Sequence, residues 1–219
     1  SKRVLCISPG IQNDLKKLGI KNTFLLPNPI VMQNMKNHIK VRSHNKIYNI
    51  VSAGRLHEQK NYDLLLDVAK LTKSNVNFLI YGTGPDKDRL KTRCLEMKLQ
   101  DKVKFKGFTS NLQEELRKAD LFLLTSKYEG FGNVIIEALS NGTKVIATDV
   151  EAGPRYIIND PEIGHLVPQD AKEIANKLDK VLSSEWPYTN NYSCIRRAMD
   201  FEMNKVYNEV SIHLDENKK

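Results

Sequence analysis

Two glutamates mark the segment of the sequence best suited to binding chemistry. Residues 126–138 read SKYEGFGNVIIEA, which places Glu129 in a glycine-containing loop and Glu137 eight positions later in an apolar run. That run predicts a helix from Gly132, and the N-terminus of a helix attracts anions. Gly130 and Gly132 let a substrate approach the backbone closely, because neither carries a Cβ atom. Glu137, roughly 8 Å along the helix axis, suits vicinal hydroxyls such as those of a ribose; the alternative is two acids that serve only solvation and the helix dipole.

A pair of cations forms a second candidate site about seventy positions earlier. Residues 52–61 read SAGRLHEQKN, so Arg55 and Lys60 follow Gly54 in one loop. Arginine binds phosphate through two parallel hydrogen bonds, and lysine adds a point charge. The two loops together predict a diphosphate pocket, whereas each loop alone also fits an ordinary charged surface.

Six short apolar runs, rich in β-branched and aromatic residues, must position these loops. They predict strands that are buried on both faces, as in a parallel sheet: Tyr48–Ala53, Val76–Tyr81, Lys102–Lys106, Leu121–Thr125, Lys144–Thr148 and Gly164–Val167. Helical patterns alternate with them at Tyr62–Lys73, Pro85–Lys98, Asn111–Ala119, Gly132–Ser140, Gly153–Asn159 and Ala171–Leu182. This alternation predicts an α/β fold with a Rossmann-like open parallel sheet flanked by helices. Both candidate loops then lie at the carboxyl edge of the sheet, where such folds bind ligands.

The predicted organisation has three parts. Residues 1–46 contain a strand at Val4–Ser8, a helix at Gly10–Leu18, a strand at Thr23–Leu26 and a basic, polar linker. This pattern indicates the end of a neighbouring domain. Residues 47–183 form the Rossmann-like domain, and residues 184–219 a C-terminal tail with one helix near Ser193–Val210 and a frayed end.

The net charge of +8 is carried by the first fifth of the 219 residues. Residues 1–50 hold nine Lys and Arg against one acid, Asp14, while the remainder is balanced. Nucleic-acid binding by the body is not expected, because it lacks a basic stripe interleaved with aromatic residues. The basic segment is either a solvated linker or a contact with a nucleic acid or an anionic membrane surface, and of these partners the membrane is the one expected. Three widely spaced cysteines favour a reducing, cytoplasmic compartment over a disulfide framework or a zinc site.

The motifs, in this order and at this spacing, resemble the donor-binding C-terminal half of the family-4 retaining glycosyltransferases of GT-B fold. The resemblance covers about residues 47–182 and rests on Gly54-Arg55-Leu56 with Lys60-Asn61, Tyr81 through Pro85, Val103 through Phe108, and Glu129 through Glu137. Residues 8–29 are similar to the end of that family's acceptor domain, with Pro29 where the family usually has glycine.

This resemblance implies a role for each candidate residue. Arg55 and Lys60 would bind the donor diphosphate and stabilise the charge of the leaving nucleotide. The backbone amides near Asn133 and Val134 would meet phosphate. No metal or other cofactor is expected, because the cations take over the neutralisation of charge.

The remaining roles concern the sugar, the ribose and the base. Glu137 would accept hydrogen bonds from the ribose hydroxyls, and Phe108 would border the base. Glu129, with the backbone around Phe131 and Gly132, would contact the transferred sugar. Arg55, Lys60 and Glu129 are therefore the expected catalytic residues, and the other named positions the substrate-binding ones.

The resemblance implies an enzyme that moves a hexose from a nucleoside-diphosphate sugar, with a UDP-sugar as the first choice, to a saccharide or lipid-linked acceptor with retention. Cell-surface polysaccharide or lipopolysaccharide synthesis is the expected setting, in the cytoplasm or at the inner face of the plasma membrane. Two alternatives stay open: a sugar-nucleotide epimerase of the same fold, and a nucleotide-sugar-binding module without activity. A plain dinucleotide-binding domain is disfavoured, because Gly82-Thr83-Gly84 is followed by Lys87 in place of a third glycine.

Overall fold

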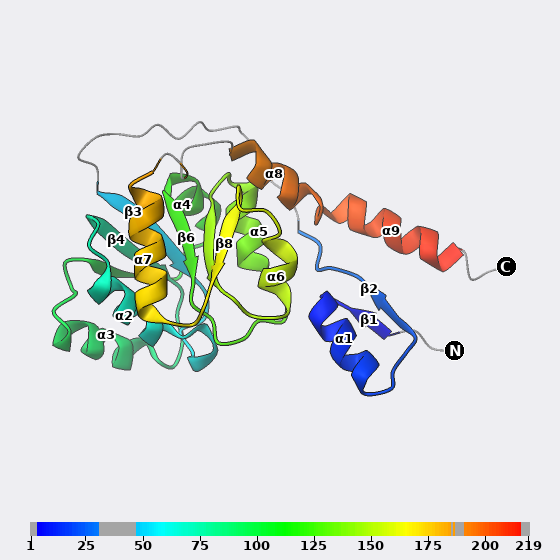
Figure 1. Cartoon of the computed structure of the whole chain (residues 1–219), viewed down its shortest axis with the longest axis horizontal. Helices are drawn as coiled ribbons and strands as arrows, with labels where there is room; N and C mark the ends of the chain where they lie inside the picture. The colour runs from blue at the N-terminus through cyan, green and yellow to red at the C-terminus, as the bar shows by residue number, and fades with distance from the viewer. Residues whose placement is uncertain (1–3, 31–46, 185, 187–190, 216–219) are drawn as a thin grey trace.

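Six parallel strands form the centre of the protein (Figure 1). The computed structural model describes residues 4–30, 47–184, 186 and 191–215. The strands are β3 (Tyr48–Ala53), β4 (Val76–Tyr81), β5 (Val103–Gly107), β6 (Leu121–Leu124), β7 (Val145–Thr148) and β8 (Gly164–Val167), in the spatial order β5-β4-β3-β6-β7-β8. The order of the strands reverses between β3 and β6, which is the position where open α/β sheets bind their ligands. The predicted Rossmann-like parallel sheet is confirmed.

Helices cover both faces of this sheet and divide the apolar core into two clusters. Neighbouring residues of one strand, such as Ile50 and Val51 in β3, belong to opposite clusters because strand side chains alternate between faces. One cluster includes side chains of α2 (Tyr62–Leu71), α3 (Lys87–Glu96) and α7 (Ala171–Leu182). The other includes those of α4 (Leu112–Lys118), α5 (Asn133–Ser140) and α6 (Gly153–Ile157). The sheet is therefore buried on both faces, as its apolar strands predict.

Some of the helix starts follow local capping chemistry. The side chains of Asn111 and Asp170 accept from the backbone N–H groups three residues later, as N-caps do. Helix α3, predicted from Pro85, begins two residues later at Lys87. The reason is a tertiary contact. The N–H of Asp86 donates to the carbonyl of Leu56 (3.1 Å), so the turn before the helix is bonded to the loop that follows β3.

The N-terminal unit is the predicted strand–helix–strand. Strands β1 (Val4–Cys6) and β2 (Thr23–Leu25) are parallel, and α1 (Pro9–Lys17) connects them. Helix α1 packs against α6 so closely that a Cβ atom on Gly10 would lie 2.9 Å from the Cα atom of Ala152. The predicted basic linker, with Lys36, Lys40, Arg42 and Lys46, lies outside the described residues.

The C-terminal tail contains two helices where the sequence predicted one. Helix α8 (Asn191–Met199) packs on α5, and α9 (Met203–Asp215) extends away from the α/β body, on the same side as the N-terminal unit (Figure 1). The break lies at Phe201, which is buried. Its carbonyl accepts from the N–H of Ile30 (2.8 Å), and the N–H of Met203 donates to the carbonyl of Ile30 (3.1 Å). These bonds to a distant strand-like segment replace intrahelical bonds, so one continuous helix cannot form. The sequence predicted a frayed end over residues 215–219. Of these, only Asp215 belongs to the described residues.

Candidate functional site

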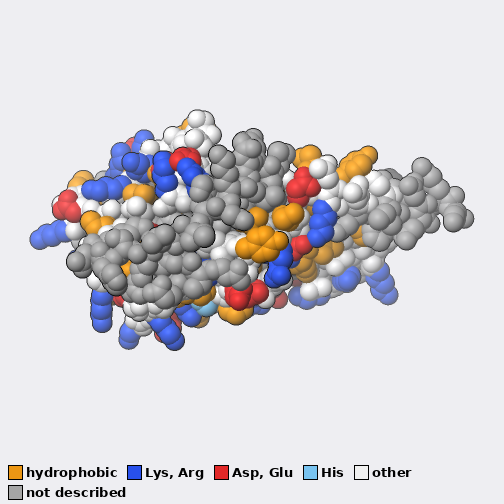
Figure 2. All heavy atoms as spheres, turned by 90° about the horizontal axis from the view of Figure 1, so that it is seen from above, with side chains coloured by type: hydrophobic (Ala, Val, Ile, Leu, Met, Phe, Trp, Pro, Cys, Tyr) orange, Lys and Arg blue, Asp and Glu red, His pale blue; other side chains and the backbone are white. Residues whose placement is uncertain are grey.

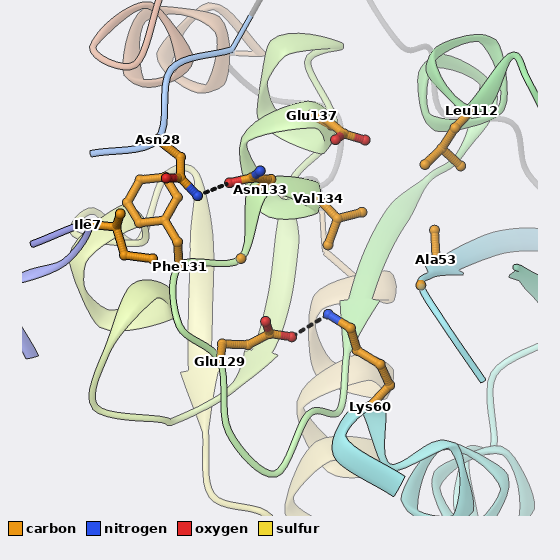
Figure 3. Close-up of a pocket in the computed structure, with 12 residues that line it drawn as sticks. Ile7, Asn28, Ala53, Lys60, Leu112, Glu129, Phe131, Asn133, Val134 and Glu137 are labelled. Atoms are coloured by element: carbon orange, nitrogen blue, oxygen red, sulfur yellow. Dashed lines mark hydrogen bonds and ion pairs between the residues drawn. The ribbon is translucent and has the colours of Figure 1, made fainter. Parts of the chain in front are cut away.

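Two adjoining pockets open at the carboxyl edge of the sheet, beside the strands where the order reverses. The first has a volume of about 430 Å³ and is lined by Ile7, Asn28, Ala53, Gly54, Lys60, Leu112, Glu129, Phe131, Gly132, Asn133, Val134 and Glu137 (Figure 3). The second has a volume of about 610 Å³ and is lined by Ala53, Gly54, Arg55, Tyr81, Gly82, Thr83, Gly84, Pro85, Phe108, Thr109 and Leu112. Ala53, Gly54 and Leu112 line both, so the pockets are continuous around the end of β3.

Glu129 is a buried carboxylate held by two donors. Its residue is only 8% exposed, which rules out the alternative of a solvated loop acid. The Lys60 Nζ atom lies 2.5 Å from Glu129 Oε1, and the Ser126 hydroxyl donates to the same oxygen at 2.6 Å. Burial of a carboxylate is tolerated when a counter-charge and hydrogen bonds compensate for lost hydration. The ion pair thus fixes Lys60 and Glu129 together on one wall of the first pocket (Figure 3).

Hydrogen bonds join the loops that carry this pair. The Thr125 hydroxyl donates to the carbonyl of Lys60 (3.1 Å), and the N–H of Lys127 donates to the carbonyl of Gln59 (2.8 Å). The Gln59 side chain in turn donates to the carbonyl of Tyr128 (3.1 Å). The loops after β3 and β6 therefore act as one braced wall across the strand reversal.

The N-terminus of α5 forms the opposite wall. Gly132 precedes this helix with φ 91°, a left-handed conformation that favours glycine. The first turn of a helix leaves backbone N–H groups without intrahelical partners, and Asn133 and Val134 stand in that turn beside the pocket. The preceding loop is fixed by α6, because a Cβ atom on Gly153 would come within 1.5 Å of the carbonyl oxygen of Phe131. A helix N-terminus placed in this way is suited to an anion.

Glu137 projects into the first pocket from the second turn of α5 (Figure 3). It is half-buried, and burial raises the pKa of its carboxyl group. Among the described residues, none donates a hydrogen bond to this carboxylate. A half-buried acceptor without a protein donor is suited to hydroxyl groups of a ligand.

Besides Gly54, the second pocket is lined by two of the predicted site residues, Phe108 and Arg55. Phe108 stands at its edge with 79% of its surface exposed, so its ring can stack on a planar ligand. Gly82 is required for packing: a Cβ atom there would lie 1.9 Å from the carbonyl oxygen of Gly54. The glycines after β4 therefore bring two loops together, which explains their presence without a dinucleotide fingerprint.

Arg55 does not line the pocket that holds Lys60. The sequence predicted that both cations would share one diphosphate pocket, but Arg55 is exposed and lines the neighbouring one. The short helix over Glu58–Lys60 separates the two side chains and directs Lys60 toward Glu129. Gly130 lines neither pocket; it faces Ile7 of the N-terminal unit, with 3.6 Å between a Cβ built on Gly130 and Ile7 Cδ1.

The N-terminal unit supplies pocket residues that the sequence analysis did not assign. Ile7 follows β1, and Asn28 follows β2. The Asn28 side-chain amide donates to the Asn133 side-chain oxygen at 3.2 Å, at the start of α5 (Figure 3). Asn28 lies in the Pro27-Asn28-Pro29 turn, which resembles a turn at the end of the family's acceptor domain. This resemblance could have identified Asn28 as a pocket residue from the sequence. Ser126 was likewise part of the quoted motif without an assigned role.

Across residues 4–30, 47–184 and 191–215, no group of three or more His, Cys, Asp and Glu side chains is placed to hold a metal ion. The three cysteines are buried and none is in a disulfide bond, so they pack as small apolar groups.

The strand order, the pocket at the strand reversal and the helix N-terminus beside it are typical of the open α/β folds that bind nucleotides. The sequence profile of the family "Glycosyl transferases group 1" matches residues 34–198. The chain belongs to this family of glycosyltransferases, and the predicted membership is confirmed.

Curated relatives match part of the chain. An N-acetylgalactosamine-N,N'-diacetylbacillosaminyl-diphospho-undecaprenol 4-alpha-N-acetylgalactosaminyltransferase of Campylobacter jejuni is 37% identical over 55% of this chain and 33% of its own length. A poly(ribitol-phosphate) alpha-N-acetylglucosaminyltransferase of Staphylococcus aureus is 33% identical over 77% of this chain and 33% of its own length. The chain thus spans about a third of the length of these relatives.

Solved structures share the fold. The apo form of the lipopolysaccharide outer core galactosyltransferase WaaB superposes with a TM-score of 0.86 at 23% identity, covering 97% of this chain and 61% of that one. HepE of Anabaena, solved with UDP and glucose, superposes with a TM-score of 0.85 at 20% identity, covering 99% and 64%. These likenesses confirm the GT-B type of α/β domain.

Proposed function

We propose that this chain is the donor-binding part of a retaining glycosyltransferase that uses a nucleoside-diphosphate sugar, with UDP as the preferred nucleotide. The observation that carries the proposal is the first pocket. It places a half-buried carboxylate without a protein donor, Glu137, opposite a buried Lys60–Glu129 pair and beside the first turn of α5. A hydroxyl-rich, doubly anionic ligand satisfies all of these groups together.

The donor is oriented by its two negatively charged phosphates. Lys60 and the N–H groups at Asn133 and Val134 bind the diphosphate, and Arg55 reaches it from the second pocket. Gly54 allows the phosphates to approach the end of β3. These groups stabilise the charge that develops on the leaving diphosphate, and no metal is required for that step.

The other parts of the donor lie on either side of the diphosphate. Glu137 accepts from the ribose hydroxyls, and the base stacks against Phe108 in the second pocket. The transferred hexose lies near Glu129 and the backbone of Phe131 and Gly132. In the transfer, the bond from the anomeric carbon to phosphate breaks, the bond to the acceptor oxygen forms on the same face, and the acceptor proton passes to the leaving diphosphate.

The acceptor is a saccharide or a lipid-linked saccharide, in the synthesis of cell-surface polysaccharide or lipopolysaccharide. The names of the Campylobacter and Staphylococcus relatives support this proposal, since they describe transfer to an undecaprenyl-linked sugar and to poly(ribitol-phosphate). The proposed site of action is cytoplasmic, at the inner face of the membrane. None of the described helices has the length and apolar character for a membrane span. Figure 2 shows basic side chains, with acidic ones among them, over one face of the α/β body. The positive surplus of the sequence precedes residue 51, so the proposed membrane contact is assigned to this basic segment.

Calorimetric titration with UDP, GDP and ADP, followed by incubation of the complete protein with labelled nucleotide sugars and saccharide acceptors, tests the proposal. We expect one diphosphate to bind, with sugar transferred to an acceptor and the anomeric configuration retained. Absence of binding by all three diphosphates would overturn it. Isomerisation of the sugar without an acceptor would indicate the epimerase alternative. Binding without any turnover would indicate the binding module.

A further inference from the structure

The Glu129 carboxylate is held from one side only. Lys60 Nζ and the Ser126 hydroxyl both donate to Oε1, at 2.5 and 2.6 Å. Within the described part of the chain, no group donates to Oε2. In Figure 3 this second oxygen points away from Lys60, toward the start of α5. One oxygen is thus anchored by the protein, and the other faces the pocket.

Ser126 cannot reach a ligand itself. The residue is fully buried, with 0% of its surface exposed. Its backbone is fixed as well, because the Thr148 hydroxyl donates to the carbonyl of Ser126 at 2.6 Å. An effect of its hydroxyl on binding must therefore pass through Glu129.

The two donors to Oε1 differ in what a diphosphate does to them. The Lys60 ammonium group carries three N–H donors and a charge that phosphate oxygens attract, so a bound diphosphate draws it away from Glu129 or shares it. The neutral Ser126 hydroxyl has no such competitor, because it is buried. Once the donor is bound, the serine is the group that still holds Oε1 in place.

We propose that Ser126 is a positioning residue: it fixes the rotation of the Glu129 carboxylate so that Oε2 is presented to a hydroxyl of the transferred sugar while Lys60 serves the diphosphate. This inference rests on the proposed function. If Ser126 acts in this way, its hydroxyl affects the binding of the sugar part of the donor and leaves the binding of the nucleotide part unchanged.

The test compares Ser126→Ala, which removes the hydroxyl, with Ser126→Thr, which keeps it. Calorimetry is run on each variant with UDP, UDP-glucose, UDP-galactose and UDP-N-acetylglucosamine. For Ser126→Ala we expect UDP affinity within about twofold of wild type and the affinity of the tightest UDP-sugar reduced about tenfold. Ser126→Thr is expected to restore the sugar affinity. Equal weakening of UDP and UDP-sugar in Ser126→Ala would overturn the proposal.

A matched control separates positioning from loss of stability. Thr143→Val removes another buried hydroxyl, which donates to the carbonyl of Leu116 at 2.6 Å away from the pocket. We expect it to lower the Tm without changing the ratio of UDP-sugar to UDP affinity. If Ser126→Ala does not fold, Ser126→Cys, similar in size but a weaker donor, takes its place and should show a reduced ratio.

A double-mutant cycle completes the test. In a Glu129→Ala background, Ser126→Ala should have no further effect on the ratio, because its target is gone. A full additional loss would overturn the proposal. If none of UDP, GDP and ADP binds the wild-type chain, the proposed function itself fails, and this inference fails with it; binding of UDP with an unchanged ratio refutes only the role of Ser126.

Discussion

Glu129 and Glu137 illustrate how one loop and helix give two carboxylates different chemistry. The charge of Glu129 is compensated by Lys60, and Ser126 donates to the same oxygen, Oε1. Glu137 is half-buried without a described donor, and burial raises the pKa of its carboxyl group. The first carboxylate is anchored through one oxygen, and the second has no anchoring donor among the described residues.

The change Glu137→Gln tests the ribose assignment. Loss of charge-assisted hydrogen bonds should weaken nucleotide binding by about 1.5–3 kcal/mol. The Tm should stay the same or rise, because the substitution removes a charge that burial disfavours. Calorimetry and thermal denaturation measure the two effects. Unchanged affinity with a lower Tm would show that Glu137 serves the helix dipole.

The pH dependence of donor binding provides an independent test of Glu137. A raised pKa means that this carboxyl takes up a proton at a higher pH than an ordinary glutamate does. Because ribose hydroxyls donate to the ionised form, affinity for UDP-glucose should fall as the pH is lowered from about 7 to about 5. UDP-glucose is chosen because its diphosphate diester does not titrate in this range. In Glu137→Gln the same titration should be flatter; an identical slope would contradict the assignment.

Arg55→Ala and Lys60→Ala should separate the two cations. Both are expected to weaken UDP far more than uridine, since cations bind phosphate in preference to base or ribose. Lys60→Ala should also lower the Tm, because it leaves Glu129 buried without its counter-charge. Arg55 is exposed, so its removal should leave the Tm unchanged. Equal losses for uridine and UDP would contradict both assignments.

At the scale of elements, the strands were predictable and some helix ends were not. Strands β3, β4 and β8 begin and end where the sequence predicted, because buried parallel strands require unbroken apolar runs. The break between α8 and α9 depends on Ile30, which is distant in sequence and leaves no local signal. Burial of Glu129 is similar, since its partner Lys60 lies 69 positions away. Local patterns therefore identified the loops, and tertiary pairing decided how their side chains are used.

Asp179 joins α7 to the turn after α2. Its carboxylate accepts from the N–H groups of Lys73 and Ser74 and from the Ser74 hydroxyl, at 2.6 to 3.2 Å. Burial alone would raise the pKa of Asp179, but these hydrogen bonds, with the charge of Lys102, lower it. The bond network therefore favours the ionised form.

Asp179→Asn should destabilise the fold by about 1–2 kcal/mol near neutral pH. Because the folded-state pKa is lowered, the stabilisation is present above the unfolded-state pKa and is lost as the pH falls through the folded-state value. Wild type and variant should therefore converge in acid. Denaturant unfolding at a series of pH values measures the difference; a gap that persists in acid would contradict this role. Nucleotide affinity, which depends on the opposite edge of the sheet, serves as the control.

At the scale of the whole molecule, charge and contacts are divided between two parts. The α/β body is electrically balanced, and the positive surplus precedes residue 51. The N-terminal unit nevertheless reaches the pocket through Ile7 and Asn28. Through Asn28 this unit is also hydrogen-bonded to Asn133, the first residue of α5.

Vesicle co-sedimentation of the complete protein tests the proposed membrane contact. Binding should increase with the content of anionic lipid and decrease with salt, because each basic residue near such a surface contributes about 1 kcal/mol. Replacing Lys36, Lys40, Arg42 and Lys46 by glutamine should reduce it, whereas glutamine at Lys87 and Lys91 in the body should not. Binding that ignores lipid charge and ionic strength would refute the electrostatic contact.

The crossing of Ile30 with Phe201 and Met203 has a consequence for recombination between relatives. Ile30 is hydrogen-bonded to Phe201 and Met203 at this place, and α8, just before Phe201, is packed on α5. Cuts at Ile30 and Phe201 would separate the N-terminal unit and α9 from the body but keep α8 on the core, whereas a cut before α8 would remove a helix from it. A chimera joined at Ile30 and Phe201 would receive the whole α/β body from one relative. We expect its preference for a nucleotide sugar to be that of the relative that supplies the body.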